Sequence, residues 1–294
     1  MYYIVYGLLY LISLLPFFIM YKLSDFIAFL LYRVFKYRKA VVLNNLLIAF
    51  PEKSDRERKK IAKEFYRNFC DTFIETIKVL SMSDKVYDER CTGNFELING
   101  IVKKGKNIQI FGAHKFNWEY ANLVMSKNIS IPAIGIYSPI ENKAMDRLFL
   151  KIRSKYNTIL VPTVTFRRQM PELMKGQYLM YLLADQSPSR IQHAYWLDFF
   201  GRETPFVAGP YKSASRSNTT IIFLDFRKIK RGYYSFDTKL VVEDAGNYSP
   251  EQLAIMYRNF VQDIIREQPD NYLWSHRRWK HTYNEEFKNN RIEG

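Results

Sequence analysis

The sequence predicts an α/β fold, with a mainly parallel central sheet flanked by helices and an N-terminal membrane-anchoring helix before it. Short apolar runs alternate with amphipathic helical segments, which is typical of parallel strands joined by crossover helices. Residues 2–21 carry no charge and are apolar on every side. No repeat or low-complexity linker divides the rest of the chain. We therefore expect an anchor at residues 1–36 and one α/β domain at residues 37–294.

The first predicted element is the anchor at residues 2–21, YYIVYGLLYLISLLPFFIMY, which is long enough to cross a bilayer. It lacks the basic start, short apolar core and small-residue cleavage site of a signal peptide. A buried core helix is the alternative, in view of the aromatic residues and Pro16. Residues 26–35 are too short to cross again and are expected at the membrane interface. Cationic residues follow the span and place the rest of the chain on the cytoplasmic side: Lys22, Arg33, Lys36, Arg38 and Lys39.

The next elements follow from apolar periodicity. A helix is predicted from the Ser54-Asp55 cap to about Leu80, with an apolar stripe at Ile61, Phe65, Phe69, Phe73 and Ile77. Strands are predicted at residues 108–111, 133–137, 158–161, 178–184, 221–226 and 236–242. Helices are predicted at residues 119–127, 143–156, 165–175 and 250–268. The last two strands are expected to form an antiparallel edge around Arg231-Gly232.

The net charge of +15 indicates an anionic partner, because 44 Lys and Arg stand against 29 Asp and Glu. A phospholipid surface, a phosphorylated ligand, an acidic protein and nucleic acid all fit this charge. No groove-reading motif accompanies the basic residues, so nucleic acid is not expected. The two cysteines, Cys70 and Cys91, form no CxxC and indicate neither a disulfide framework nor a zinc site.

The stretch QIFGAHKFNWE places His114 directly after a predicted strand and Glu119 five residues later. Ligands of α/β sheets gather at the carboxyl ends of strands. Two residues five apart on one helix point about 140° away from each other, so His114 must lie in the turn to meet Glu119. A carboxylate that accepts the imidazole Nδ1–H makes Nε2 a general base. A structural histidine–carboxylate pair is the alternative that the spacing leaves open.

Other catalytic arrangements are missing from the sequence. It contains no GxSxG, HExxH, GxGxxG or Walker motif. His193, His276 and His281 lack metal-ligand spacing with one another or with the cysteines. A base without an evident protein nucleophile favours activation of a substrate hydroxyl for direct attack.

Six segments together resemble the motifs of a known family. They are residues 38–51 (RKAVVLNNLLIAFP), 114–119 (HKFNWE), 147–153 (RLFLKIR), 184–186 (ADQ), 199–205 (FFGRETP) and 268–280 (QPDNYLWSHRRWK). In these segments the chain resembles the late acyltransferases of lipid A biosynthesis (lauroyl/myristoyl type), within the lysophospholipid-acyltransferase-like enzymes. The H-x4-E of residues 114–119 is weak alone but strong together with the C-terminal block, and the segments occur in the family's order over nearly the whole chain. The alanine–threonine run of the family is replaced by residues 206–210.

The resemblance implies a glycerol-3-phosphate-acyltransferase-like fold and an inner-membrane enzyme whose catalytic domain faces the cytoplasm. Such an enzyme moves a fatty acyl chain from an acyl carrier protein thioester to a hydroxyl of a phosphorylated glycolipid, the lipid A precursor. His114 would be the base and Glu119 its partner. No acyl-enzyme, metal or further cofactor is implied.

The resemblance also suggests substrate-binding residues. Arg153 would bind phosphate or stabilise oxyanion charge, and Arg147 shares its helix, although both also fit a solvated helix face. Asp185 and Gln186 would support the base or line the acceptor site, or serve only as strand caps. Arg277 and Arg278 fit a structural or phosphate-facing place better than a catalytic one.

Two other functions remain open on the sequence. The same fold could acylate an aminolipid or a glycerolipid, or the chain could be a noncatalytic, membrane-tethered basic binding protein. The residues do not define the acyl chain length or hydroxylation, the position acylated or the type of donor thioester.

Overall fold

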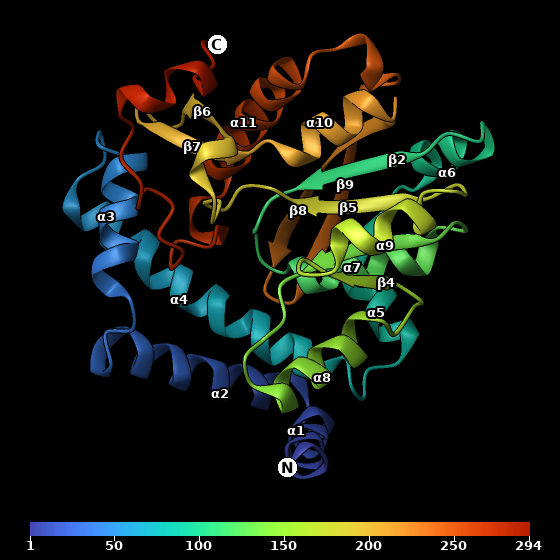
Figure 1. Cartoon of the computed structure of the whole chain (residues 1–294). Coiled ribbons are helices and arrows are strands. Elements are labelled where there is room, and N and C mark those ends of the chain that lie inside the picture. The colour runs from blue at the N-terminus through green and yellow to red at the C-terminus, as the bar shows by residue number, and fades with distance from the viewer.

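Nine strands form two sheets in the computed structural model, which describes residues 1–294 (Figure 1). They are β1 (Cys91–Gly93), β2 (Ile108–Gly112), β3 (Ala133–Tyr137), β4 (Ile159–Pro162), β5 (Leu179–Leu183), β6 (Ala194–Asp198), β7 (Glu203–Val207), β8 (Thr220–Lys230) and β9 (Tyr233–Val242). The central sheet has seven strands in the order β1-β9-β8-β2-β5-β3-β4. Strands β8, β2, β5, β3 and β4 are mutually parallel, which confirms the mainly parallel sheet.

Strands β8 and β9 form the antiparallel hairpin predicted around Arg231-Gly232. Gly232 has a φ of 75°, a left-handed conformation that glycine adopts without a side-chain clash. The prediction that this hairpin forms the edge of the sheet is wrong. The short strand β1 pairs in parallel with β9 and takes the edge position.

Eleven α-helices accompany the sheets (Figure 1). They are α1 (Tyr2–Leu14), α2 (Phe17–Phe29), α3 (Lys39–Ala49), α4 (Asp55–Lys78), α5 (Asp84–Arg90), α6 (Glu96–Lys103), α7 (Trp118–Asn128), α8 (Lys143–Arg153), α9 (Phe166–Leu173), α10 (Gly209–Arg216) and α11 (Pro250–Glu267). The long helix α4 begins with the predicted cap, because Ser54 and Glu57 form a reciprocal capping box. The helices α7, α8, α9 and α11 lie where the periodicity predicts them, within a few residues at their ends.

Two hydrophobic cores cover the two faces of the central sheet. Alternate residues of β8 enter different cores: Ile221 and Phe223 pack with α10 and α11, whereas Ile222 and Leu224 pack with α5, α6, α7 and α8. A strand buried on both faces in this way is typical of a parallel sheet between helix layers. The two helix layers thus enclose the sheet, and the loops that follow β2 and β5 leave it at its carboxyl edge.

The hairpin β6–β7 and the helix α10 were not among the predicted elements. The two strands are only five residues each, and β6 is buried at four consecutive positions. Their apolar pattern therefore lacks the alternation that marks a half-buried strand. The hairpin packs beside the C-terminal segment, at the end of the molecule opposite α1 (Figure 1).

The N-terminal segment is not the continuous helix that its composition predicts. It breaks at Pro16 into α1 and α2, because proline lacks an N–H and its ring disfavours helical backbone at the residue before it. The helix α2 continues through a π-helical turn, Leu30–Val34. No single helix is both long and apolar enough to cross a bilayer; α1 and residues 17–34 meet the length and composition test only as a pair bent by 117°.

The two N-terminal helices pack on the α/β domain. The helix α1 contacts α4 and α8, and α2 lies along α4 (Figure 1). Arg231, in the β8–β9 turn, joins α2 to α4 through ion pairs with Asp25 of α2 at 2.8 Å and Asp71 of α4 at 2.7 Å. Ser24 donates a hydrogen bond to the same Asp71. The exposed faces of α1 and α2 remain apolar, and eight of their side chains are more than half exposed: Tyr3, Ile4, Leu8, Leu11, Leu14, Phe18, Phe26 and Phe29.

Candidate active site

The candidate site lies where the parallel strands β2 and β5 end. Their register pairs Gly112 with Leu183, so the residues two positions further along each chain, His114 and Asp185, leave the sheet side by side. His114 lies in the loop before α7, as the geometric argument requires. The carboxyl edge of the sheet thus brings an imidazole and a carboxylate together from segments 71 positions apart.

Asp185 is the partner of the His114 imidazole. Nδ1 of His114 lies 2.7 Å from Oδ1 of Asp185, and the backbone N–H of His114 donates to the same oxygen at 3.2 Å. Burial of the carboxyl group acts to raise its pKa, but the charge and hydrogen bonds of His114 outweigh burial and lower the pKa of Asp185 below its ordinary value. An ionised Asp185 accepts the Nδ1–H and leaves Nε2 as the basic nitrogen.

The His114 imidazole is held by Asp185 but remains partly exposed to solvent. Its side chain is 18% exposed, whereas the side chain of Asp185 is completely buried. Nε2 has no hydrogen-bond partner in the chain and is not enclosed. The indole of Trp118 stands edge-on to the imidazole, with ring centroids 5.5 Å apart. The free nitrogen can therefore receive a proton from a substrate hydroxyl.

The hydrogen bond expected between His114 and Glu119 is not formed. Glu119 is the second residue of α7 and forms a two-pronged ion pair with Arg153, the last residue of α8. Nε of Arg153 lies 2.8 Å from Oε2 of Glu119, and Nη2 lies 2.5 Å from Oε1. The guanidinium fork matches both carboxylate oxygens, so Glu119 is held by Arg153 and not by the imidazole.

Glu119 is nevertheless linked to the imidazole through Trp118. The indole Nε1–H of Trp118 donates to Oε1 of Glu119 at 3.2 Å. Asn122 of α7 donates to the backbone carbonyl of Arg153 at 2.9 Å, which ties the end of α8 to α7 a second time. The structure therefore brings together four of the predicted site residues: His114, Glu119, Arg153 and Asp185.

A buried carboxylate supports the start of α7. Asn117 caps this helix by accepting the backbone N–H groups of Glu119 and Tyr120. Its amide donates to Oε2 of Glu75 on α4 at 3.1 Å, and the hydroxyl of Tyr234 donates to the same oxygen at 2.6 Å. Burial, and then the charge of nearby Asp71, raise the pKa of Glu75. Tyr21 of α2 donates to Oε1 of Glu75, so the N-terminal helices also contact this network.

The C-terminal segment closes over the other side of the His114 loop. The backbone N–H of Leu273 donates to the carbonyl of His114 at 3.0 Å, and that of Phe116 donates to the carbonyl of Asn271 at 2.9 Å. Asn45 of α3 donates to the carbonyls of Trp274 and His276, both at 2.8 Å. Three segments that resemble known motifs are thus adjacent in space although they are distant in the sequence.

His276 connects the same segment to the loop after β5. Its Nε2 accepts the backbone N–H of Ser187 at 3.0 Å. Burial and the charge of Arg278 lower the pKa of His276 to about 4. The ring is therefore neutral at neutral pH, as an acceptor must be.

The remaining predicted residues lie differently. Gln186 is half-buried next to Asp185 and forms no hydrogen bond in the chain. Arg147 lies on another face of α8 and stacks on the ring of Tyr2 in α1, 4.2 Å from its centroid. Arg278 is buried and donates to the carbonyl of Pro205, so its place is structural.

The prediction that Glu119 is the direct partner of His114 is wrong, because Asp185 takes this place. Glu75 and Asn117 were not among the predicted site residues. The signal for Asp185 was present, because the ADQ segment ends a predicted strand. Its proximity to His114 depends on β2 and β5 being neighbours, which the chain order does not reveal. No group of three or more His, Cys, Asp or Glu side chains in the chain has a metal-binding arrangement.

Residues 1–281 match the family described as bacterial lipid A biosynthesis acyltransferase. Lipid A biosynthesis lauroyltransferase of Escherichia coli (strain K12) is 24% identical over 282 residues, 93% of this chain and 89% of that protein. Lipid A biosynthesis palmitoleoyltransferase of the same organism is 23% identical over 250 residues, 83% of this chain and 79% of that protein. Lipid A biosynthesis acyltransferase of Haemophilus influenzae is 24% identical over 247 residues, 83% and 78% of the two chains.

Proposed function

The chain belongs to the bacterial lipid A biosynthesis acyltransferases, and on this premise we propose that it transfers a fatty acyl chain from an acyl carrier protein thioester to a hydroxyl of a lipid A precursor. It is an acyltransferase by its family. The observation that carries the specific proposal is the His114–Asp185 pair, in which a buried carboxylate orients an imidazole whose other nitrogen is free. This arrangement suits removal of a proton from an alcohol.

In the proposed reaction, Nε2 of His114 takes the proton of the acceptor hydroxyl as its oxygen attacks the thioester carbonyl. The new ester C–O bond forms, the C–S bond breaks, and the departing sulfur takes the proton from the imidazolium. Asp185 accepts the Nδ1–H throughout and stabilises the positive charge of the ring. No acyl-enzyme is needed, because the acceptor hydroxyl is the nucleophile.

Glu119 and Arg153 act as positioning residues in this proposal. Their ion pair holds the start of α7, and with it Trp118 beside the imidazole. The side chain of Arg153 is only 20% exposed and both prongs of its fork are occupied by Glu119. Its direct use as a phosphate ligand would require this pair to open, so we assign phosphate binding to other cations.

We further propose that the protein works at the cytoplasmic face of the inner membrane. The apolar faces of α1 and α2 expose the side chains that a lipid surface would cover. The net charge of +15 complements both the acidic acyl carrier protein and a phosphorylated glycolipid. Binding to the membrane surface brings the lipid acceptor to the protein, while the soluble thioester arrives from the cytoplasm.

The decisive experiment mixes the purified protein in detergent with a tetra-acyl lipid A precursor and a panel of acyl carrier protein thioesters, with products weighed by mass spectrometry. We expect a product heavier by one acyl chain with at least one donor. His114→Ala should remain folded and form this product at a rate lower by a factor of about 10² to 10⁴. Acylation of an aminolipid or glycerolipid, with none of the lipid A precursor, would refute the proposed acceptor. A wild-type rate in His114→Ala would refute the mechanism.

A further inference from the structure

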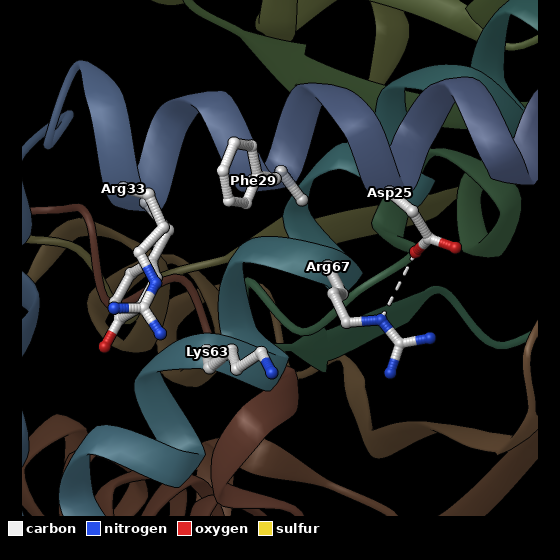
Figure 2. Close-up of a pocket in the computed structure, with 7 residues that line it drawn as sticks. Asp25, Phe29, Arg33, Lys63 and Arg67 are labelled. Carbon is white, nitrogen blue, oxygen red and sulfur yellow. Dashed lines mark hydrogen bonds and ion pairs between the residues drawn. The ribbon is translucent and has the colours of Figure 1, made fainter.

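A cavity of about 270 Å³ lies between α2 and α4, away from the candidate active site. We call it the α2–α4 pocket; its lining includes Asp25, Phe29, Tyr32, Arg33, Lys63 and Arg67. Figure 2 shows Arg33 reaching from the π-helical turn after α2 toward α4, which carries Lys63 and Arg67, with Arg67 directed toward Asp25. Three cations and one carboxylate thus share this small space.

The positive charge of the pocket is not neutralised within the chain. Asp25 is shared between Arg67, at 3.3 Å, and Arg231, at 2.8 Å, and Arg67 also pairs with Glu64 of α4 at 3.0 Å. Arg33 and Lys63 form no ion pair and no hydrogen bond with any group of the chain, and both are exposed. Arg67 is thus paired within the chain, and the two unpaired cations, Arg33 and Lys63, are the groups that favour an anionic ligand.

The surroundings of the pocket favour a lipid over a soluble anion. Phe29 lines the pocket and is itself 56% exposed. Phe26, Val34 and Phe35, on the same helix and the turn after it, are exposed by 59%, 56% and 69%. A charged cavity with an exposed apolar rim matches a phosphate-bearing headgroup with acyl chains attached, because each part of the lipid meets its own chemistry.

The pocket is separate from the site of acyl transfer. On α4, Phe65 and Phe69 face the His114 loop, since their rings lie 5.7 and 6.1 Å from the ring of Phe116. Lys63 and Arg67 each lie two positions from Phe65, which corresponds to about 200° around a helix. The helix α4 therefore stands between the pocket and His114, and a ligand in the pocket is not the chain being acylated.

We propose that the α2–α4 pocket binds the anionic phosphate headgroup of a membrane phospholipid that is not a substrate. The proposal rests on the membrane seating put forward above and adds a specific headgroup site to it. The bound lipid would hold α2 at a defined depth in the bilayer surface, with the phenylalanines among the acyl chains. The domain, with its active site across α4 from the pocket, would then be held in one orientation relative to the bilayer.

The test compares binding of purified, full-length protein to two kinds of vesicles, phosphatidylcholine alone and phosphatidylcholine with one-fifth phosphatidylglycerol. The variant Arg33→Gln/Lys63→Gln removes the two unpaired cations and should keep the fold, because neither side chain forms a hydrogen bond or ion pair in the chain and Arg33 contacts only the ring of Tyr32, 5.5 Å from its centroid. We expect it to lose about ten- to thirtyfold of the preference for phosphatidylglycerol vesicles, with binding to phosphatidylcholine unchanged. The matched control is Lys22→Gln/Lys36→Gln, which removes two unpaired cations from the same N-terminal segment outside the pocket. This control variant should lose less than about a third of the phosphatidylglycerol preference that the pocket variant loses.

Three outcomes would overturn the proposal. An equal loss in the control variant would mean diffuse attraction of the whole segment. Release of the wild-type protein by millimolar inorganic phosphate, beyond the effect of sodium chloride at the same ionic strength, would mean a soluble-anion site. Loss of acyl transfer by Arg33→Gln/Lys63→Gln in detergent micelles without phospholipid would place the pocket in the acceptor site. Acyl transfer at the wild-type rate in these micelles, with the vesicle preference lost, supports the headgroup site. Absence of transfer by the wild-type protein would refute the proposed function alone.

Discussion

At the scale of residues, the two carboxylates near His114, Asp185 and Glu119, make different contacts. Asp185 is completely buried and contacts the imidazole, whereas Glu119 is paired with Arg153 and contacts only the indole beside that imidazole. The spacing of residues 114–119 correctly predicted that His114 lies in the turn before α7. It could not identify Asp185, because that contact is made across neighbouring strands and not along the chain.

Replacement of Asp185 by Asn should abolish most activity while the fold is retained. The neutral amide neither stabilises the imidazolium nor enforces the Nδ1–H tautomer, so we expect turnover to fall by a factor of about 10² to 10⁴. Initial rates of acyl transfer measure this, with far-ultraviolet circular dichroism as the check on folding. Asp198→Asn, at the exposed end of β6, is the matched control and should keep its rate within about twofold. A wild-type rate in Asp185→Asn would show that this carboxylate has no part in the chemistry.

Glu119 and Arg153 should behave as one unit in a double-mutant cycle. Glu119→Gln and Arg153→Gln each remove one half of the same ion pair, so each should lower kcat/KM by about 10²-fold through displacement of the start of α7. The double variant should lose no more than the worse single variant, because the second change has no remaining interaction to remove. Losses that multiply would instead indicate separate roles, such as a direct contact of Arg153 with substrate.

At the scale of elements, α7 is held at its start by groups from three other elements. Asn117 caps the helix and donates to Glu75 of α4, which also accepts from Tyr234 of β9 and Tyr21 of α2. The helix whose first turn carries Trp118 and Glu119 is thereby tied to the sheet and to the N-terminal helices. These hydrogen bonds explain why Glu75 is buried on α4, the helix for which the sequence predicts an apolar stripe. Its carboxylate accepts hydrogen bonds from donors of other elements, and buried polar groups need such partners.

Asn117→Ala should destabilise the protein more than an ordinary cap deletion. It removes the cap, worth about 1 kcal/mol, and leaves the buried Glu75 with one donor fewer, worth about 1–3 kcal/mol more. The control is Asn142→Ala, since Asn142 caps α8 through two backbone N–H groups in the same way but has no buried carboxylate behind it. Urea unfolding of both variants measures the difference. Equal losses in the free energy of unfolding would show that the Asn117–Glu75 bond contributes nothing.

Periodicity predicts correctly those helices and strands whose own apolar pattern determines which of their side chains are buried. Strand β3 begins and ends as predicted because an apolar run between helical segments has few other structures available. The prediction of one continuous helix over residues 2–21 was wrong, because the single Pro16 interrupts the helix whatever the hydropathy of the residues around it. The edge position of the β8–β9 hairpin was wrong because β1 has only three residues and no pattern of its own.

At the scale of the whole molecule, segments from both ends of the chain enclose the loops that carry His114 and Asp185. Asn45 of α3 binds the carbonyls of Trp274 and His276, and His276 in turn accepts the N–H of Ser187 just after β5. The sequence blocks that resemble known motifs are therefore one structural unit. Their grouping could not be read from the chain, because it results from tertiary contacts between residues more than 80 positions apart.

This unit should make the stability of the protein depend on pH through His276. The pKa of His276 is about 4 in the folded protein, below its ordinary 6.5, chiefly because burial disfavours the charged ring. Between these values the unfolded chain binds a proton that the folded chain does not. The contribution of this group is therefore complete above pH 6.5 and is lost as the pH falls toward 4.

The corresponding experiment follows the free energy of unfolding from pH 7 to pH 5 by urea titration. The wild-type value should fall over this range. In His276→Gln the part of the fall that His276 causes should be absent, because the amide oxygen still accepts the Ser187 N–H and does not titrate. His193→Gln is the matched control: this histidine is exposed, forms no hydrogen bond in the chain, and its replacement should preserve the wild-type slope. If His276→Gln loses stability with acid as steeply as the wild type, the acid sensitivity arises elsewhere, and the ring does not serve as the neutral link between the two segments.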